Sequence, residues 1–202
     1  NLFSDGLALQ AMRLIAPNLR RVWTDPGDRA AREAMMLGAT QAGIAFSNAS
    51  VALVHGMSRP IGAHFHVAHG LSNAMLLPAV TAFSAPAAID RYAACARAMK
   101  IAGPDTDDRS AVSALVTELE ALNDDLDVPG PQEYGIDPAR WEALLPTMAA
   151  PALAPGPPAN HPAEPSAHAA AARPRRGPAR WRRRPTGRPR APASVPRRRR
   201  TA

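Results

Sequence analysis

The stretch "RAAREAMMLGATQAGIAFSNASVALV", residues 29–54, decides the fold class. Its first turns are polar on one side, and the rest is small and apolar nearly all round. That pattern predicts one helix buried among other helices. At 1.5 Å per residue, a helix of this length crosses a whole domain. Asp28, directly before the stretch, is the predicted N-cap.

Five further segments have helical character and short connections. They are residues 5–19, 70–78, 85–103, 107–127 and 137–149. In the first, Ser4 is the predicted cap and Pro17 kinks the helix or ends it early, and in the last, Asp137 is the cap and Pro138 takes the first helical position. The helix over 107–127 is amphipathic, with Val112, Leu115, Leu119 and Leu122 on one face. No alternating pattern of useful length indicates a strand. The sequence therefore predicts an all-α helical bundle.

Charge and proline divide the chain near residue 150. Residues 1–150 hold 11 Lys and Arg against 16 Asp and Glu, whereas residues 151–202 hold 13 Arg and one acid, Glu164. Twelve of the 22 prolines also follow residue 150. We predict an all-helical metal-binding domain over 1–150, a Pro-rich loop over 151–166, and a disordered Arg- and Pro-rich tail over 167–202.

The basic tail has two interpretations. Its arginines, together with Trp181, are suited to salt-sensitive binding of nucleic-acid phosphates without sequence preference. Arg, Pro, Ala and Gly are also the residues that GC-rich DNA encodes when it is read out of frame. We favour a frameshift product over a nucleic-acid-binding arm.

Three absences bound the class of protein. Cys95 is the single cysteine, so no disulfide forms within the chain, in keeping with a reducing compartment. The N-terminus lacks the pattern of a signal peptide, and no uncharged apolar run reaches about 18 residues. We therefore expect a cytoplasmic protein without a membrane span.

The segment "VHGMSRPIGAHFHVAHG", residues 54–70, holds four of the six histidines. If the chain turns back at Pro60–Gly62, His55 and His69 reach one point between a helix end and the next helix start. Imidazole is a ligand for zinc and divalent iron, although such sites use three or four ligands. The alternative is that these histidines only hydrogen-bond backbone carbonyls at helix ends and in loops.

The longer stretch "GIAFSNASVALVHGMSRPIGAHFHVAHGLSNAMLLPAV" resembles the signature of the iron-containing, or group III, alcohol dehydrogenases. The shared pattern is HGMxxPIG, a short loop, then HG followed by an asparagine and apolar residues. The similarity extends from about Leu2 to about Ser166. It implies the dehydroquinate synthase-like, all-helical C-terminal domain of that family.

The resemblance also implies a metal site and a reaction. In the family one aspartate and three histidines hold the metal, and two of these ligands fall on His55 and His69, for Fe²⁺ or Zn²⁺. The other two belong to a D-x-x-x-H element that nothing in this sequence matches. NAD(P) is bound by a nucleotide-binding domain absent from this sequence. The implied reaction is reversible oxidation of a small alcohol to an aldehyde or ketone, with the metal as Lewis acid.

Two further positions match the family pattern. Arg59 stands where many members have a proton-relay histidine, and a guanidinium cannot shuttle a proton. It is suited to orient a substrate carboxylate or a cofactor phosphate, or simply to stabilise the C-terminus of a helix. Phe46 matches a position that lines the substrate pocket, with a core phenylalanine as the alternative. His64 and His66 match no ligand and are assigned supporting or structural roles.

The functional hypothesis is a C-terminal fragment of an iron-dependent NAD(P) alcohol dehydrogenase. We expect this chain alone to be inactive, to expose the apolar face that meets the missing domain, and to form homo-oligomers as part of the full-length enzyme. The rival hypotheses are a nucleic-acid-binding protein that uses the basic tail, and an interaction module that has lost catalysis.

Overall fold

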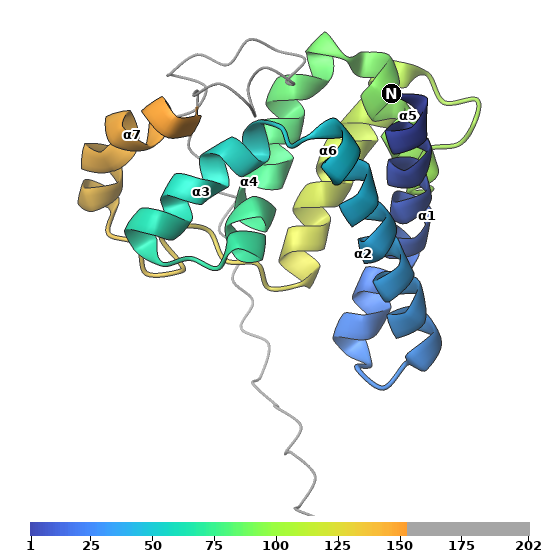
Figure 1. Ribbon diagram of the computed structural model, residues 1–202, viewed down its shortest axis with the longest axis horizontal. Coiled ribbons are helices and arrows are strands. Elements are labelled where there is room, and N and C mark those ends of the chain that lie inside the picture. The colour runs from blue at the N-terminus through green and yellow to red at the C-terminus, as the bar shows by residue number, and fades with distance from the viewer. Residues whose placement is uncertain (153–202) are drawn as a thin grey trace, which may run out of the picture.

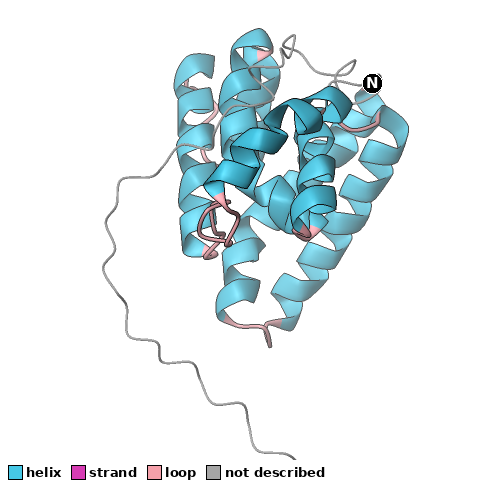
Figure 2. Ribbon diagram, turned by 90° about the vertical axis from the view of Figure 1, so that its left-hand side faces the viewer, coloured by secondary structure: helices cyan, strands magenta, loops and turns pink. Residues whose placement is uncertain are grey.

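The computed structural model describes residues 1–152, and within them the chain is helical with no strand (Figure 2). The elements are α1 Leu2–Thr24, α2 Arg29–Ala49, α3 Leu53–Phe65, α4 His69–Ser84, the 3-10 turn η1 Ala85–Ala87, α5 Ile89–Ala98, α6 Asp108–Asp125 and α7 Pro138–Ala152. The predicted all-α bundle is confirmed. Almost all of the predicted Pro-rich loop and the whole predicted tail lie outside the described residues.

The helices α1 and α2 form an antiparallel hairpin at one side of the molecule (Figure 1). The predicted cap of α2 is confirmed, because Asp28 Oδ1 accepts a hydrogen bond from the Ala31 amide at 3.0 Å. The start of α1 differs from the prediction, since Asn1 rather than Ser4 is the cap and accepts from the Ser4 amide at 2.9 Å. The helix also continues through Pro17, because its length packs along α2.

The helix α2 is shorter and more exposed than predicted. It ends at Ala49 instead of reaching Val54, because Ser50 adopts the positive φ of 66° that stops a helix. Only the face with Ala31, Gly38 and Ala45 is buried.

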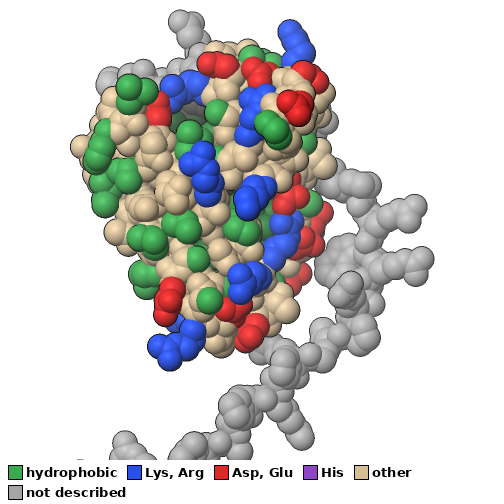
Figure 3. All heavy atoms as spheres, turned by 90° about the vertical axis from the view of Figure 1, so that its right-hand side faces the viewer, with side chains coloured by type: hydrophobic (Ala, Val, Ile, Leu, Met, Phe, Trp, Pro, Cys, Tyr) green, Lys and Arg blue, Asp and Glu red, His purple; other side chains and the backbone are tan. Residues whose placement is uncertain are grey.

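The prediction that α2 is buried on all sides is wrong. Its large apolar side chains are exposed by 71 % at Met36, 51 % at Leu37, 44 % at Ile44 and 56 % at Phe46. Figure 3 views the side of the α1–α2 hairpin and shows hydrophobic side chains at the surface among Lys and Arg. Within the described chain, the residues of α2 that are buried are all small.

The sequence analysis missed the helix α3. The expected turn at Pro60–Gly62 is wrong, because both residues lie inside α3. Pro60 and Ile61 are buried there, so packing offsets the hydrogen bond that proline removes. The chain reverses instead just beyond the helix, where His66 adopts the left-handed conformation with φ 55°.

The helix α4 likewise runs past its predicted end at Pro78, to Ser84. Pro78 has no N–H for the carbonyl of Ala74, one turn earlier. The side chain of Asn123 in α6 supplies that donor, with Nδ2 at 2.8 Å from the Ala74 oxygen. A hydrogen bond from α6 therefore replaces the one that Pro78 cannot make, and α4 continues past the end that the sequence predicted.

Two apolar clusters hold the helices together. The larger joins α3, α4 and α7 and contains Leu53, Met57, Ile61, Val67, Met75, Leu76, Ile136 and Met148. The smaller joins α5 to α6 through Ala93, Ala96, Ala111, Leu115 and Leu119. Each fully buried large apolar side chain contributes about 1.5–3 kcal/mol. The larger cluster holds α3 against α4, the two helices that carry the histidines.

The remaining boundaries agree in part with the prediction. In α6, Leu115 and Leu119 are buried as expected, while Val112 and Leu122 are only partly buried. The single helix expected over 85–103 is divided into η1 and α5. The cap of α7 is confirmed, because Asp137 Oδ2 accepts from the Arg140 amide at 2.9 Å.

Within residues 1–152, no single helix has both the length and the apolar composition to cross a membrane. The helices α2 and α3 meet those criteria only together, as a pair bent by 103°.

Candidate metal centre

The α3–α4 hairpin brings His55 and His69 together. Their ring centroids lie 5.2 Å apart, with the ring planes tilted by 57°. His55 belongs to the first turn of α3 and His69 is the first residue of α4. The predicted meeting of these two imidazoles is therefore confirmed, although the chain turns after Phe65 and not at Pro60–Gly62.

Two fully buried serines connect the helices beneath the imidazoles. The Ser58 hydroxyl donates to the His55 carbonyl at 3.2 Å and lies 3.4 Å from Nδ1 of His69. The Ser72 hydroxyl donates to the His69 carbonyl at 3.0 Å and lies 3.4 Å from the Ser58 carbonyl oxygen. The sequence analysis missed both residues, although Ser58 is one helical turn after His55 and Ser72 one turn after His69.

Asn73 contacts the other nitrogen of His69. Its Nδ2 lies 3.2 Å from Nε2 of the ring and 3.1 Å from the carbonyl oxygen of the same residue. The sequence analysis noted this asparagine only as part of the family pattern. Its spacing of four residues from His69 places it over the ring on the same face of α4.

The surroundings of His55 favour its neutral form. Burial lowers the pKa of the half-buried His55 imidazole, and the electrostatic influence of the neighbouring His69 and Arg59 lowers it further. A neutral imidazole offers a lone pair, which is the form that binds a metal ion.

The donor set can be compared with the metal that the resemblance implies. Two neutral imidazoles on facing helices suit Zn²⁺ or Fe²⁺, which both accept nitrogen ligands. A complete protein site needs a third or fourth ligand. Within the described residues, no cluster of three or more His, Cys, Asp or Glu side chains gathers to supply them. The described residues thus fit part of such a site.

The structure does not test the roles predicted for Arg59 and Phe46, but it places both residues. Arg59 is exposed in the middle of α3, so its interpretation as a group that stabilises the helix C-terminus is wrong. Phe46 lies in the last turn of α2 and is 56 % exposed, so it is not part of the core formed by the described residues.

The segment with His64 and His66 contacts α7. The His64 carbonyl accepts a hydrogen bond from Arg140 Nη2 at 3.0 Å. Between these histidines, Phe65 stacks on Trp141 with ring centroids 5.5 Å apart, and the Arg140 guanidinium lies 5.3 Å above the Phe65 ring. These contacts fix the end of α3 and support a structural role for this segment.

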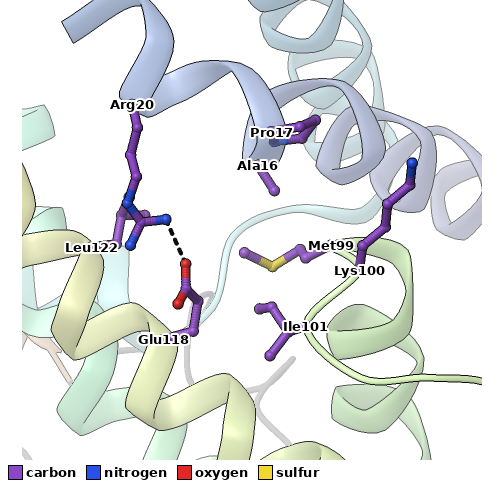
Figure 4. Close-up of a pocket in the computed structure, with 8 residues that line it drawn as sticks. All are labelled: Ala16, Pro17, Arg20, Met99, Lys100, Ile101, Glu118 and Leu122. Carbon is purple, nitrogen blue, oxygen red and sulfur yellow. Dashed lines mark hydrogen bonds and ion pairs between the residues drawn. The ribbon is translucent and has the colours of Figure 1, made fainter. Parts of the chain in front are cut away.

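A separate cavity of about 320 Å³ opens between α1, the end of α5 and α6. It is lined by Ala16, Pro17, Arg20, Met99, Lys100, Ile101, Glu118 and Leu122. Met99 and Ile101 point into it, and Arg20 pairs with Glu118 across one side (Figure 4). None of the predicted site residues lines this cavity.

Comparisons of the sequence with known proteins identify relatives of this chain. Residues 1–169 match the family described as "Fe-containing alcohol dehydrogenase family, C-terminal". The NADPH-dependent butanol dehydrogenase of Clostridium saccharobutylicum is 37 % identical over 135 residues, which cover 66 % of this chain and 34 % of that protein. The lactaldehyde reductase of Escherichia coli K12 is 38 % identical over 126 residues, which cover 62 % of this chain and 32 % of that protein.

The comparison with solved structures points to the same family. A crystal structure of 1,3-propanediol oxidoreductase superposes with a TM-score of 0.78 at 30 % identity, covering 85 % of this chain and 44 % of the other. This chain spans about a third of the length of the curated relatives it matches. The family match ends close to Ser166, where the sequence analysis placed the end of the similarity. On these grounds the chain belongs to the Fe-containing alcohol dehydrogenase family and spans its C-terminal, helical part.

Proposed function

We propose that His55 and His69 are two ligands of a divalent iron or zinc ion in an NAD(P)-dependent alcohol dehydrogenase. The observation that carries the proposal is the approach of the two imidazoles to 5.2 Å in a chain of this family. The reaction proposed is reversible oxidation of a small alcohol to an aldehyde or ketone. The relatives named above as butanol dehydrogenase and lactaldehyde reductase support that substrate class.

The residues of this chain have defined tasks in the proposal. When bound, the metal supplies Lewis acidity to a substrate oxygen, and the nicotinamide carries the hydride. The imidazoles of His55 and His69 hold the metal as neutral ligands. Arg59, exposed one turn after His55, orients an anionic group of substrate or cofactor and moves no proton. Phe46 lines the substrate pocket with its exposed ring.

This chain alone is proposed to be inactive. The described residues bring together two imidazoles, and two imidazoles bind a divalent ion more weakly than a full set of ligands. The proposal therefore includes a nucleotide-binding domain as the partner that supplies the remaining ligands and the NAD(P) site. The exposed apolar side chains of α2 are one surface for that partner. The full-length enzyme is proposed to be a homo-oligomer.

Titration with Co²⁺, a spectroscopic substitute for zinc and iron, tests the ligand assignment. We expect weak binding to this chain, and an affinity at least ~10-fold lower in His55→Ala and in His69→Ala. The matched control is His64→Ala/His66→Ala, which removes two imidazoles from the same hairpin and should leave the affinity unchanged. A control variant that loses as much affinity as His55→Ala would contradict the assignment.

A second measurement tests the proposed inactivity. Mixed with NAD⁺ or NADP⁺, Fe²⁺ and a series of short alcohols, this chain should produce no nicotinamide absorbance above the rate without protein. Turnover that disappears in His69→Ala would show that the chain is active alone.

The comparisons give no support to the rival hypothesis of a nucleic-acid-binding protein. The basic segment on which it rests lies outside the described residues.

A further inference from the structure

We propose that Ser58 is a positioning residue that fixes the His69 ring as the tautomer with its proton on Nδ1, so that the Nε2 lone pair is ready for the metal. The inference rests on the proposed role of His69 as a ligand. It concerns a hydroxyl group to which neither the sequence pattern nor the family comparison assigns a function.

The Nε2 side of the ring determines the tautomer. The Asn73 nitrogen lies 3.1 Å from the His69 carbonyl oxygen. A carbonyl oxygen only accepts, so the atom facing it must be the amide NH₂ and not the amide oxygen. The same NH₂ lies 3.2 Å from Nε2 and can only donate there. Nε2 therefore carries the lone pair, and the single proton of the neutral ring is on Nδ1.

The Nδ1 side has one acceptor, the Ser58 hydroxyl. Ser58 Oγ lies 3.2 Å from the His55 carbonyl oxygen, which accepts the hydroxyl proton. The Oγ lone pair then faces the proton on Nδ1 of His69, 3.4 Å away. Ser58 is fully buried, whereas His69 is exposed, so the hydroxyl is held by the protein beneath a ring whose outer side faces solvent. A chain of hydrogen bonds thus runs from the ring of one histidine to the backbone of the other.

This arrangement matches the way in which proteins prepare a metal-binding histidine. A ligating imidazole donates its second N–H to a protein acceptor, which fixes both the tautomer and the ring orientation. Here Ser58 is that acceptor, and the Asn73 NH₂ that donates to the Nε2 lone pair is the group that a bound cation would displace. Loss of such an acceptor lowers metal affinity by roughly 10–100-fold.

Ser72 provides a matched control. Its side chain is as fully buried as that of Ser58 and lies in the same interface between α3 and α4. Its hydroxyl bonds only to backbone carbonyls, those of His69 and Ser58. Ser72→Ala therefore removes a buried hydroxyl and a comparable packing contribution but leaves the Nδ1 acceptor in place.

The first measurement needs neither metal nor variant. We would record long-range ¹H–¹⁵N spectra of the ring of His69 across a range of alkaline pH, until the spectrum no longer changes. His69→Gln identifies the signals. We expect a protonated Nδ1 and an unprotonated Nε2 in the wild-type chain. A proton found mainly on Nε2 overturns the proposal.

The variants separate orientation from packing. Ser58→Ala should shift the tautomer population toward Nε2–H and weaken Co²⁺ binding about 10-fold. Ser72→Ala should leave the tautomer unchanged and the affinity within about twofold. The proposal is overturned if Ser58→Ala changes neither quantity, or if Ser72→Ala changes both equally.

If His55 and His69 are not metal ligands, the experiments give a different pattern from the one expected if Ser58 does not fix the tautomer. In that case the wild-type chain and the His55→Ala variant bind Co²⁺ equally, while the ring spectrum still reports whether Ser58 fixes the tautomer.

Discussion

Gly38 of α2 lies so close to Ile15 of α1 that a β-carbon at Gly38 would be 2.7 Å from the Ile15 Cγ1 atom. The Ala11 carbonyl oxygen would be 3.3 Å away from the same β-carbon. Glycine at this position lets the two helices of the hairpin approach each other. A β-carbon at Gly38 would therefore force the Ile15 side chain to move and would press against the backbone of α1 at Ala11.

We expect Gly38→Ala to destabilise the chain by about 1–3 kcal/mol, the usual cost of overpacking. Gly43, in the same helix, is the matched control, because nothing lies within 4 Å of a β-carbon there. Gly43→Ala should be neutral or stabilise by up to ~1 kcal/mol through helix propensity. Urea unfolding followed by circular dichroism measures both. Equal effects of the two substitutions would show that the close contact has no energetic weight.

The hydrogen bond from Asn123 to the Ala74 carbonyl gives a second prediction. Asn123→Ala should cost about 1–3 kcal/mol, because it leaves the carbonyl that Pro78 cannot bond without a donor. Pro78→Ala restores a backbone N–H in the same turn. In the double variant, loss of Asn123 should therefore cost less than it does in the wild-type chain. Additive costs in this double-mutant cycle would contradict the link between the two residues.

Cys95 gives a prediction about reactivity. Burial raises the pKa of the Cys95 thiol, so the reactive thiolate is scarce at neutral pH. We expect iodoacetamide to modify the folded chain at least ~10-fold more slowly than the chain in denaturant, with the rate rising as pH increases. Mass spectrometry over a time course measures this. Equal rates in the two conditions would mean that the α5–α6 region opens freely.

The two aspartate caps predict loss of stability in acid. Hydrogen bonds from the backbone amides of Ala31 and Ser110 lower the pKa values of Asp28 and Asp107 respectively. A carboxylate with a lowered pKa in the folded state stabilises the fold above its unfolded pKa, and this stabilisation is lost as pH falls through the folded pKa.

The variant Asp28→Asn/Asp107→Asn keeps side-chain oxygens that cap a helix but cannot titrate. Its urea midpoint should fall less between pH 7 and pH 3 than that of the wild-type chain. Parallel curves for the two proteins would show that these caps do not contribute to acid sensitivity.

The sequence predicted the helices best where their ends carry a chemical signal. Asp28 and Asp137 were predicted correctly because a carboxylate before a helical run caps a helix by local contacts. The helix α3 was not predictable, because Pro60 and two glycines outweighed its apolar residues in a local reading. Its stability comes from packing against α4 and α7, which are contacts that no sequence window contains.

The same distinction applies to the candidate site. Spacing was enough to predict that His55 and His69 meet, since both lie in one hairpin. The roles of Ser58 and Asn73 depend on side-chain rotamers and on which atom of each group faces the ring. The exposure of the apolar side chains of α2 could not be predicted from the sequence either. Apolar composition indicates that a helix face tends to be buried, but it does not identify the part of the protein that buries it.

The left-handed turn at His66 has a consequence for the order in which the chain folds. It joins the two imidazoles through a single helical hairpin, so their meeting requires closure of one short loop, an event of about 10–100 ns for some ten residues. Pairing of α4 with α6 spans a far longer stretch of chain and is slower, because contacts between distant residues carry a larger entropy cost. The two histidines can therefore come together before the rest of the bundle is complete, while the hairpin that carries them still needs α7 to bury its apolar face.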